Sequence, residues 1–234
     1  MLVHGAFHGG WCYARVAALL RAQGHHVFTP TLTGLGERSH LAHIGVNASM
    51  HVNDVTNVII WEQLDDVVLC GHASSGIIVA AVADRMPDRI AALVYLDAAV
   101  PEGSGSNLDL VSVEEQVIVL QMAAANGGLM LPASGVTSFD VNPADREMVE
   151  TLATPHPLAA MCERLPLTGA YNKVTKVYIH ATRYKGSHPK QSYEQARSDP
   201  NWITYKIDCG HDIMLDAPER LAEILNEFAC YPTA

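Results

Sequence analysis

The sequence has little charge, no long hydrophobic run and no basic start, and each absence excludes a class of protein. Charged residues make up only 17% of the 234 residues and hydrophobic residues 49%, which excludes a disordered chain and a coiled coil. The longest apolar runs, such as Ile77–Ala83, fall far short of the roughly 20 residues of a membrane span. Because no basic segment precedes the first apolar residues, we expect no signal peptide.

Basic residues are the scarcer of the two charged classes. Lys and Arg total 15, against 25 Asp and Glu, which gives a formal net charge of −10. A negative surface repels polyanions, so we expect neither nucleic acid nor an anionic membrane as a partner.

The cysteines form no pairing pattern. They are odd in number and widely separated, at Cys12, Cys70, Cys162, Cys209 and Cys230. We therefore expect reduced thiols in a cytoplasmic protein, with neither a disulfide framework nor a zinc site. A chain of this length buries roughly 70–75% of its unfolded surface and folds without such cross-links.

Short apolar segments alternate with helical segments along most of the chain. Strand character is found at Met1–His4, His26–Thr29, Val67–Cys70, Ile90–Leu96, Lys176–Ala181 and Trp202–Ile207. Helical spacing of apolar residues is found at Trp11–Gln23, Ser49–Trp61, Ile77–Met86, Gln191–Arg197 and Glu219–Cys230. This alternation predicts an α/β fold, with a mostly parallel central sheet covered by helices on both faces.

The alternation lapses between about residues 101 and 171. This stretch has helical segments at Val113–Ala125 and near Pro143–Leu152, separated by a break rich in glycine and proline. We expect residues 1–100 and 171–234 to form the core, and residues 101–170 to form a small helical cap insertion over the sheet.

The turn at residues 71–76, GHASSG, has the layout of a nucleophile elbow, a tight strand-to-helix turn that presents a nucleophile. The residues two before and two after the nucleophile must be small, and helix packing favours glycine three positions after it. Position 73 meets these conditions through Gly71, Ser75 and Gly76. Placing the nucleophile at Ser74 or at Ser75 puts a bulky residue at one of these positions.

Position 73 is alanine, which cannot attack a substrate. Three interpretations are open. The chain is a Ser→Ala form inactivated at Ala73, or a natural homologue without catalysis, or an enzyme in which Ser74 takes over the attack.

A small-residue turn follows the first apolar segment, in the sequence HGAFHGGW over residues 4–11. Small residues let backbone N–H groups face a reaction centre and form an oxyanion hole with the N–H that follows the nucleophile. We predict that the N–H groups of Ala6 and Ser74 form this hole, with Phe7 as the substitute for Ala6. The alternative is a glycine-rich turn shaped only by packing.

His211 follows the last predicted strand and precedes the last predicted helix. In this layout that position holds the general base, whose imidazole takes the proton of the nucleophile and returns it to the leaving group. None of the other histidines is so placed. His40 and His43 have a spacing that suits a metal, but no carboxylates lie near them, and we expect neither a metal site nor an organic cofactor.

Taken together, these segments resemble the α/β-hydrolases of the methylesterase and hydroxynitrile-lyase branch. The matching residues are Val3–Trp11, Thr33–Ser39, Gly71–Gly76, Leu96-Asp97-Ala98 and Gly210-His211, which span nearly the whole chain. Within the branch, the Thr33–Ser39 segment is more similar to bacterial esterases, including those that cleave the methyl carbamate of benzimidazole fungicides such as carbendazim. The resemblance implies an α/β-hydrolase fold and a serine-type reaction.

The catalytic acid departs from the pattern of that branch. The resemblance places an Asp after the strand at Lys176–Ala181, but Tyr184 occupies that position, and a phenol is a poor partner for imidazolium. Some hydrolases of this fold carry the acid one strand earlier, where this chain has Asp97. A carboxylate at the end of an apolar strand is costly without a partner, so we assign the acid to Asp97. Asp208 and Asp212 are too close in sequence to His211 to reach it easily.

Lyase chemistry is disfavoured by a second departure. The resembling lyases use a Thr beside the first-strand His and a Lys after the catalytic His, and the equivalents here are Gly5 and Asp212. Without the cation, a leaving cyanide lacks its stabilising charge.

The sequence therefore predicts a small carboxyl-ester or carbamate hydrolase with Ala73 at the nucleophile position. The resemblance implies a small methyl ester or methyl carbamate of an aromatic group as substrate, and we expect Phe7 and Met214 to line its pocket. A ligand-binding homologue that lost its nucleophile is the alternative from another class. The sequence allows a homodimer.

Overall fold

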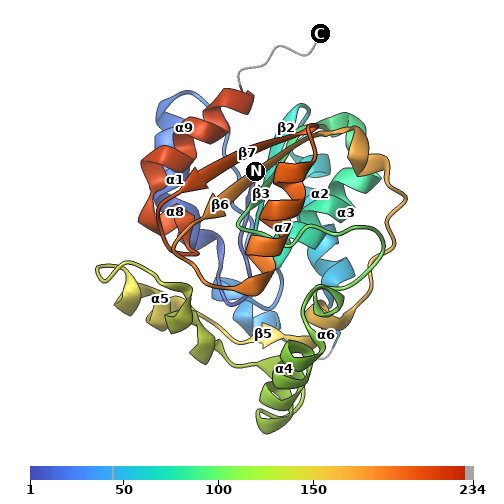
Figure 1. Cartoon of the computed structure of the whole chain (residues 1–234), viewed down its shortest axis with the longest axis vertical. Helices are drawn as coiled ribbons and strands as arrows, with labels where there is room; N and C mark the ends of the chain where they lie inside the picture. Colours follow the sequence, from blue (N-terminus) through green and yellow to red (C-terminus); the bar gives the residue numbers. More distant parts are fainter. Residues whose placement is uncertain (44, 230–234) are drawn as a thin grey trace.

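The computed structural model describes residues 1–43 and 45–229 and has a five-stranded parallel sheet at its centre (Figure 1). The strands lie in the order β1-β2-β3-β6-β7. Their bounds are Leu2–Val3 for β1, Val67–His72 for β2, Ile90–Leu96 for β3, Thr175–Ala181 for β6 and Trp202–Ile207 for β7. Every neighbouring pair in this sheet is parallel, which confirms the predicted α/β architecture.

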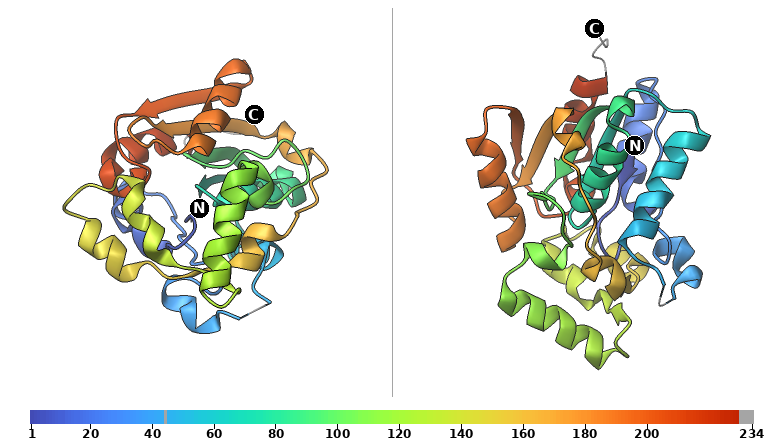
Figure 2. Two further views of the ribbon diagram at one scale, coloured as in Figure 1. Left: turned by 60° about the horizontal axis from the view of Figure 1, so that its bottom comes forward. Right: turned by 90° about the vertical axis from the view of Figure 1, so that its right-hand side faces the viewer.

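Helices cover both faces of the sheet, as the apolar strands predict (Figure 2). One face packs against α2 (Ala48–Trp61), α3 (Ser75–Arg85) and α7 (Ser187–Ser198). The other packs against α1 (Ala14–Ala22), α8 (Ile213–Asp216) and α9 (Pro218–Ala229). Alternate residues of β3 enter different cores: Leu93 and Tyr95 join the first, and Val94 and Leu96 join the second. All four are fully buried, which explains the continuous apolar run in the sequence.

Short-range signals define where several helices begin and end. Asn47 caps α2 by accepting a hydrogen bond from the N–H of Met50 at 2.9 Å. After α1 the chain turns at Gly24, whose φ of +92° is readily adopted only by glycine.

The segment between β3 and β6 lies beyond the carboxyl ends of the strands (Figures 1 and 2). The part beyond the strands comprises η4 (Leu108–Leu110), α4 (Val113–Ala125), β4 (Met130–Leu131), η5 (Ala133–Phe139), α5 (Arg146–Leu152), β5 (His156–Pro157) and α6 (Leu158–Cys162). The chain then returns to the amino end of β6 through η6 (Ala170–Lys173), which contacts α3. Its Thr154 donates from the backbone N–H to the Phe7 carbonyl at 2.8 Å and accepts the Gly36 N–H on its hydroxyl at 3.0 Å. These bonds attach the segment to the loops that follow the strands. The cap boundaries at 101 and 170 stay a prediction.

Some short elements differ from the sequence-based expectation. The predicted strand His26–Thr29 is wrong: it forms no ladder, and it meets β1 through the Phe28 carbonyl, which accepts the Leu2 N–H at 2.9 Å. Pro30, which follows, has no N–H with which to extend a pairing. The short elements β4, β5, α6 and α8 carry too few residues to show a period.

Other expectations concern cross-links, metals and membranes. No disulfide joins the four cysteines within the described residues, and Cys230 lies outside them. Across residues 1–43 and 45–229, no group of three or more His, Cys, Asp or Glu side chains could hold a metal ion. In the same part of the chain no helix is long and apolar enough to span a membrane.

Candidate active site

Ala73 occupies the tip of a sharp turn between β2 and α3. Its φ is +50°, a left-handed conformation that costs energy for any residue with a side chain. The turn is held by the Ala73 N–H, which donates to the Leu96 carbonyl at 3.2 Å, and by the Ala73 carbonyl, which accepts the Ala99 N–H at 3.0 Å. The chain therefore adopts a strained elbow at a residue that carries only a methyl group.

The neighbouring glycines are required by packing. A Cβ at Gly76 would overlap the carbonyl oxygen of Ala99, and a Cβ at Gly71 would lie 2.6 Å from a methyl carbon of Val79. These contacts let α3 approach the sheet closely. The small residues that pointed to position 73 in the sequence are thus small for steric reasons.

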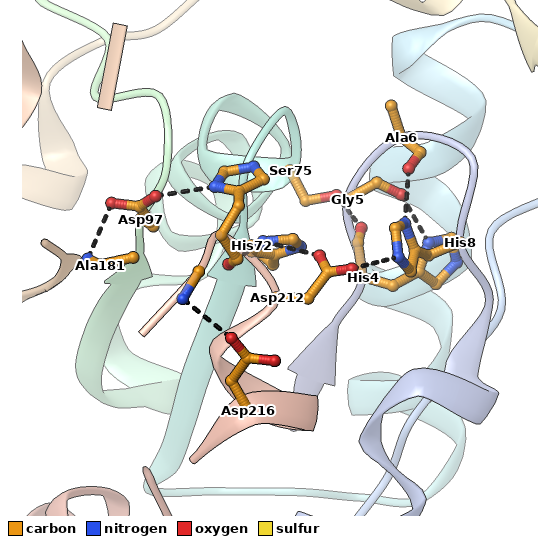
Figure 3. Close-up of polar contacts among 12 residues, drawn as sticks. His4, Gly5, Ala6, His8, His72, Ser75, Asp97, Ala181, Asp212 and Asp216 are labelled. Atoms are coloured by element: carbon orange, nitrogen blue, oxygen red, sulfur yellow. Dashed lines mark hydrogen bonds and ion pairs between the residues drawn. The ribbon is translucent and has the colours of Figure 1, made fainter. Parts of the chain in front are cut away.

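The two serines after Ala73 have different environments. The Ser75 hydroxyl is buried and donates to the His4 carbonyl (Figure 3). Ser74 has helical dihedral angles, with φ −62° and ψ −20°, and immediately precedes α3. Neither serine occupies the strained tip of the turn.

The turn after β1 presents backbone N–H groups. Phe7 has a φ of +69°, and the His8 ring donates from Nδ1 to the Ala6 carbonyl at 2.8 Å (Figure 3). Among the described residues, no acceptor binds the N–H groups of Ala6, Phe7 or Ser74. These N–H groups are therefore available to donate hydrogen bonds to an oxygen of the substrate.

Asp97 and His211 are brought together from residues 114 positions apart. Asp97 follows β3 with a φ of +43°, and its Oδ2 accepts the Nδ1–H of His211 at 2.7 Å. Its Oδ1 accepts the Ala181 N–H at 3.1 Å and the Nδ1–H of His180 at 2.9 Å. Burial raises the pKa of Asp97, but the hydrogen bonds from His180 and His211 outweigh burial and bring the pKa below its ordinary value. Asp97 is therefore a buried carboxylate that orients the His211 ring.

Aromatic rings enclose the other side of His211. Tyr184 stacks on it with ring centroids 4.3 Å apart, and Phe139 meets it edge-on at 5.2 Å. Burial raises the pKa of Tyr184, with Asp97 and Asp212 adding to the effect, so the phenol stays neutral. With Nδ1–H donated to Asp97, the His211 Nε2 is left as a proton acceptor.

A second histidine–carboxylate pair lies beneath the site, and sequence reasoning missed it. The Asp212 Oδ2 is 3.1 Å from His8 Nε2, and its Oδ1 is 3.8 Å from His72 Nε2 (Figure 3). Burial raises the pKa of Asp212, but the charge and hydrogen bond of His8 outweigh it and lower the pKa to about 2. The sequence showed Asp212 only as a neighbour of His211, and nothing marks a pairing with His8.

The two predicted pocket residues lie in different environments. Phe7 is partly buried, with its ring centroid 6.4 Å from that of Phe139. Met214 is fully buried on α8 within the core that includes Cys12 and Val16. The structure thus groups Phe7 with the rings around His211, while Met214 packs in the core.

Comparison with known proteins shows the family to which this chain belongs. A family model described as the alpha/beta hydrolase family matches residues 1–224, and the chain belongs to that family. The chain is 41% identical to the carbendazim hydrolyzing esterase of Nocardioides sp. (strain SG-4G), covering 96% of this chain and 97% of that protein. It is 33% identical to the pyrethroid hydrolase of Sphingobium wenxiniae, covering 99% and 88%. An extracellular alpha/beta-hydrolase from a Paenibacillus species has the same fold, with a TM-score of 0.85 at 24% identity over 98% of both chains.

Proposed function

We propose that this chain has the active site of a serine-type carboxyl-ester or carbamate hydrolase in which Ala73 stands at the position of the nucleophile. The observation that carries the proposal is the 2.7 Å hydrogen bond between the Asp97 carboxylate and His211, on a scaffold that also holds Ala73 at a φ of +50°. A buried carboxylate that orients a histidine and a backbone turn with positive φ both cost folding free energy. Together they are the arrangement that nucleophilic catalysis uses.

The reaction of the serine form follows from these positions. The hydroxyl introduced at position 73 attacks the substrate carbonyl carbon while the His211 Nε2 accepts its proton. The carbonyl oxygen becomes an oxyanion that accepts the N–H groups of Ala6 and Ser74, with Phe7 as the substitute for Ala6. His211 then returns the proton to the leaving alcohol or amine as its bond to carbon breaks. Water, activated in the same way, releases the acyl or carbamyl group.

Asp97 makes this proton transfer possible without being protonated itself. It fixes the His211 tautomer with the proton on Nδ1 and stabilises the imidazolium that forms during attack. No step requires a metal ion or an organic cofactor.

The proposed substrates are small methyl esters or methyl carbamates of aromatic groups. The names of the relatives, a carbendazim hydrolyzing esterase and a pyrethroid hydrolase, support this class. The rings of Phe7, Phe139 and Tyr184 beside His211 supply apolar surface that suits an aryl group. Asp212, a carboxylate buried against His8, occupies the position where the lyases have a lysine cation. A leaving cyanide would lack that stabilising charge, so hydroxynitrile lyase chemistry is disfavoured.

A ligand-binding function is the second candidate, and Ala73 itself favours it. A pocket without a nucleophile can hold an ester intact, as an inactivated serine enzyme also would. The two candidates differ in what a serine hydroxyl at position 73 does. In an inactivated enzyme it attacks the substrate carbonyl, and in a binding protein whose site no longer supports catalysis it does not react.

The test compares the native chain with Ala73→Ser on a p-nitrophenyl ester and on an aryl methyl carbamate. We expect hydrolysis only in the serine form, and Ser74→Ala in that background should retain it. A folded Ala73→Ser protein that hydrolyses neither substrate would exclude the hydrolase proposal for these substrates. Activity in the native chain that Ser74→Ala abolishes would transfer the nucleophile to Ser74.

A further inference from the structure

His180 is the second histidine on the Asp97 carboxylate, and the proposed reaction does not use it. Its Nδ1 donates to Asp97 Oδ1 at 2.9 Å, and its ring stacks on Tyr193 with centroids 4.7 Å apart. The ring is largely buried, and within the described residues its Nε2 has no hydrogen-bond partner. Because Nδ1–H is already donated to Asp97, Nε2 is the nitrogen left for a ligand, and it donates to that ligand when the ring carries a second proton.

His180 lines a cavity of about 330 Å³ at the carboxyl ends of β6 and β7. Three of the chain's five lysines also line it: Lys185, Lys190 and Lys206. In a chain of net charge −10 this concentration of positive charge runs against the average of the surface. The volume suits a small organic molecule.

The groups around the cavity reinforce its positive character. The acid among the lining residues, Glu194, is neutralised by Arg197, whose guanidinium lies 2.6 Å from its Oε2. The Lys206 ammonium lies 5.2 Å from the centroid of the Tyr193 ring, so it is held over the same tyrosine that stacks on His180. Gly186, which precedes α7, also lines the cavity, and a helix N-terminus adds partial positive charge.

We propose that this cavity binds a small carboxylate anion, held by His180 Nε2–H and by the ammonium groups of Lys185 and Lys190. The tyrosine rings of Tyr184 and Tyr193 form apolar walls, so an aromatic carboxylate fits better than a compact inorganic ion. Charge-assisted hydrogen bonds to the carboxylate oxygens supply the affinity.

The site is linked to His211 through the shared carboxylate. An anion on Nε2–H, with Nδ1–H donated to Asp97, makes the His180 ring an imidazolium. That cation competes with His211 for the charge of Asp97. This part of the inference rests on the proposed function. The carboxylate product of ester hydrolysis binds at His180 and thereby regulates His211, the base of the reaction that forms it.

The test uses the native chain, in which binding is measured without turnover. Benzoate is titrated at low ionic strength while the histidine ring signals are followed by nuclear magnetic resonance, with His180 assigned by His180→Gln. We expect a saturable shift of the His180 signals with benzoate and none with benzamide, its neutral analogue. Lys185→Gln combined with Lys190→Gln should weaken benzoate binding at least about tenfold, since each lost charge-assisted bond is worth about that factor.

Lys173→Gln is the matched control, because Lys173 is exposed on η6 near the opposite end of β6. It should leave benzoate affinity within about twofold, the range expected of a distant surface substitution. The proposal is overturned if benzoate produces no saturable shift, if benzamide binds equally well, or if the double lysine variant binds like the native chain. None of these outcomes depends on whether Ala73→Ser restores hydrolysis.

Discussion

His8 and Asp212 form a buried ion pair across 204 residues of sequence, with Nε2 and Oδ2 3.1 Å apart. The other His8 nitrogen donates to the Ala6 carbonyl, so both ring nitrogens face acceptors and the ring carries a proton on each. Burial lowers the pKa of His8, but the Asp212 carboxylate outweighs burial and raises the pKa above its ordinary value. A charged pair therefore supports the turn whose N–H groups are proposed to bind the oxyanion.

Removing the charge of Asp212 should destabilise the protein strongly. Asp212→Asn leaves the His8 cation buried without its partner, and breaking such a pair costs about 3–5 kcal/mol. Urea unfolding measures the loss, and Asp208→Asn, at an exposed carboxylate that accepts a hydrogen bond from Thr182, is the control with little expected effect. Equal stability of Asp212→Asn and the native chain would show that the pair is not charged.

Stability should fall as the pH is lowered below 6.5, because several buried histidines are neutral. Burial lowers the pKa of His4 and of His72 to about 3, and it lowers the pKa of His156 as well. The unfolded chain takes up these protons near pH 6.5 and the folded chain does not, so protonation favours unfolding between about pH 6.5 and 3. Each such histidine contributes a slope of up to about 1.4 kcal/mol per pH unit.

Urea unfolding across this pH range measures that dependence. His4→Gln should reduce the slope by about one histidine's share, while His26→Gln, at an exposed site, should not change it. A free energy of unfolding that stays flat from pH 6.5 to 4 would contradict the neutral state of these rings.

In the Ala73→Ser form, Asp97→Asn should remove most of the activity. The amide presents an N–H or a weaker acceptor to His211 and loses the charge that stabilises imidazolium, which costs about 10³–10⁴-fold in kcat. Steady-state kinetics on the p-nitrophenyl ester measure the loss. Asp208→Asn in the same background is the control, and a loss below about tenfold for Asp97→Asn would assign the acid elsewhere.

Gly76→Ala should destabilise the elbow, because the added methyl group overlaps the Ala99 carbonyl. Overpacking of this kind costs about 1–3 kcal/mol or more. Gly103→Ala is the matched control, since a Cβ there meets no atom within 4 Å. Thermal unfolding should place the first variant clearly below the native chain and the second within about 0.5 kcal/mol of it.

The sequence predicted the parts of the fold that repeat a local pattern. The helix Val113–Ala125 and the strands Ile90–Leu96 and Trp202–Ile207 have the predicted bounds, because a period of apolar residues reports burial directly. The steric demands of Gly71 and Gly76 could likewise be predicted, since elbow geometry leaves no room for side chains. The two-residue strands β4 and β5 are too short for any period.

The hydrogen-bonded pairs of polar residues in the site could not be predicted in full from local sequence patterns. Asp97 could be selected because an acid at the end of an apolar strand needs a partner, and the structure supplies two, His211 and His180. His180 stands in a predicted strand, where it looked like one more strand residue. Its pairing, like that of His8 with Asp212, exists only because strand order β3-β6 and the loop after β7 bring distant segments together.

The proposed function rests on the assignment of position 73 as the position of the nucleophile. It is tested most directly by treating the Ala73→Ser form with an aryl carbamate that carbamylates serine enzymes and locating the modified residue by mass spectrometry of peptides. We expect one carbamyl group per chain, on the residue at position 73, absent from the native chain and lost in the His211→Ala background. A folded serine form that acquires no carbamyl group, or acquires it at Ser74 or Ser75, would contradict this assignment.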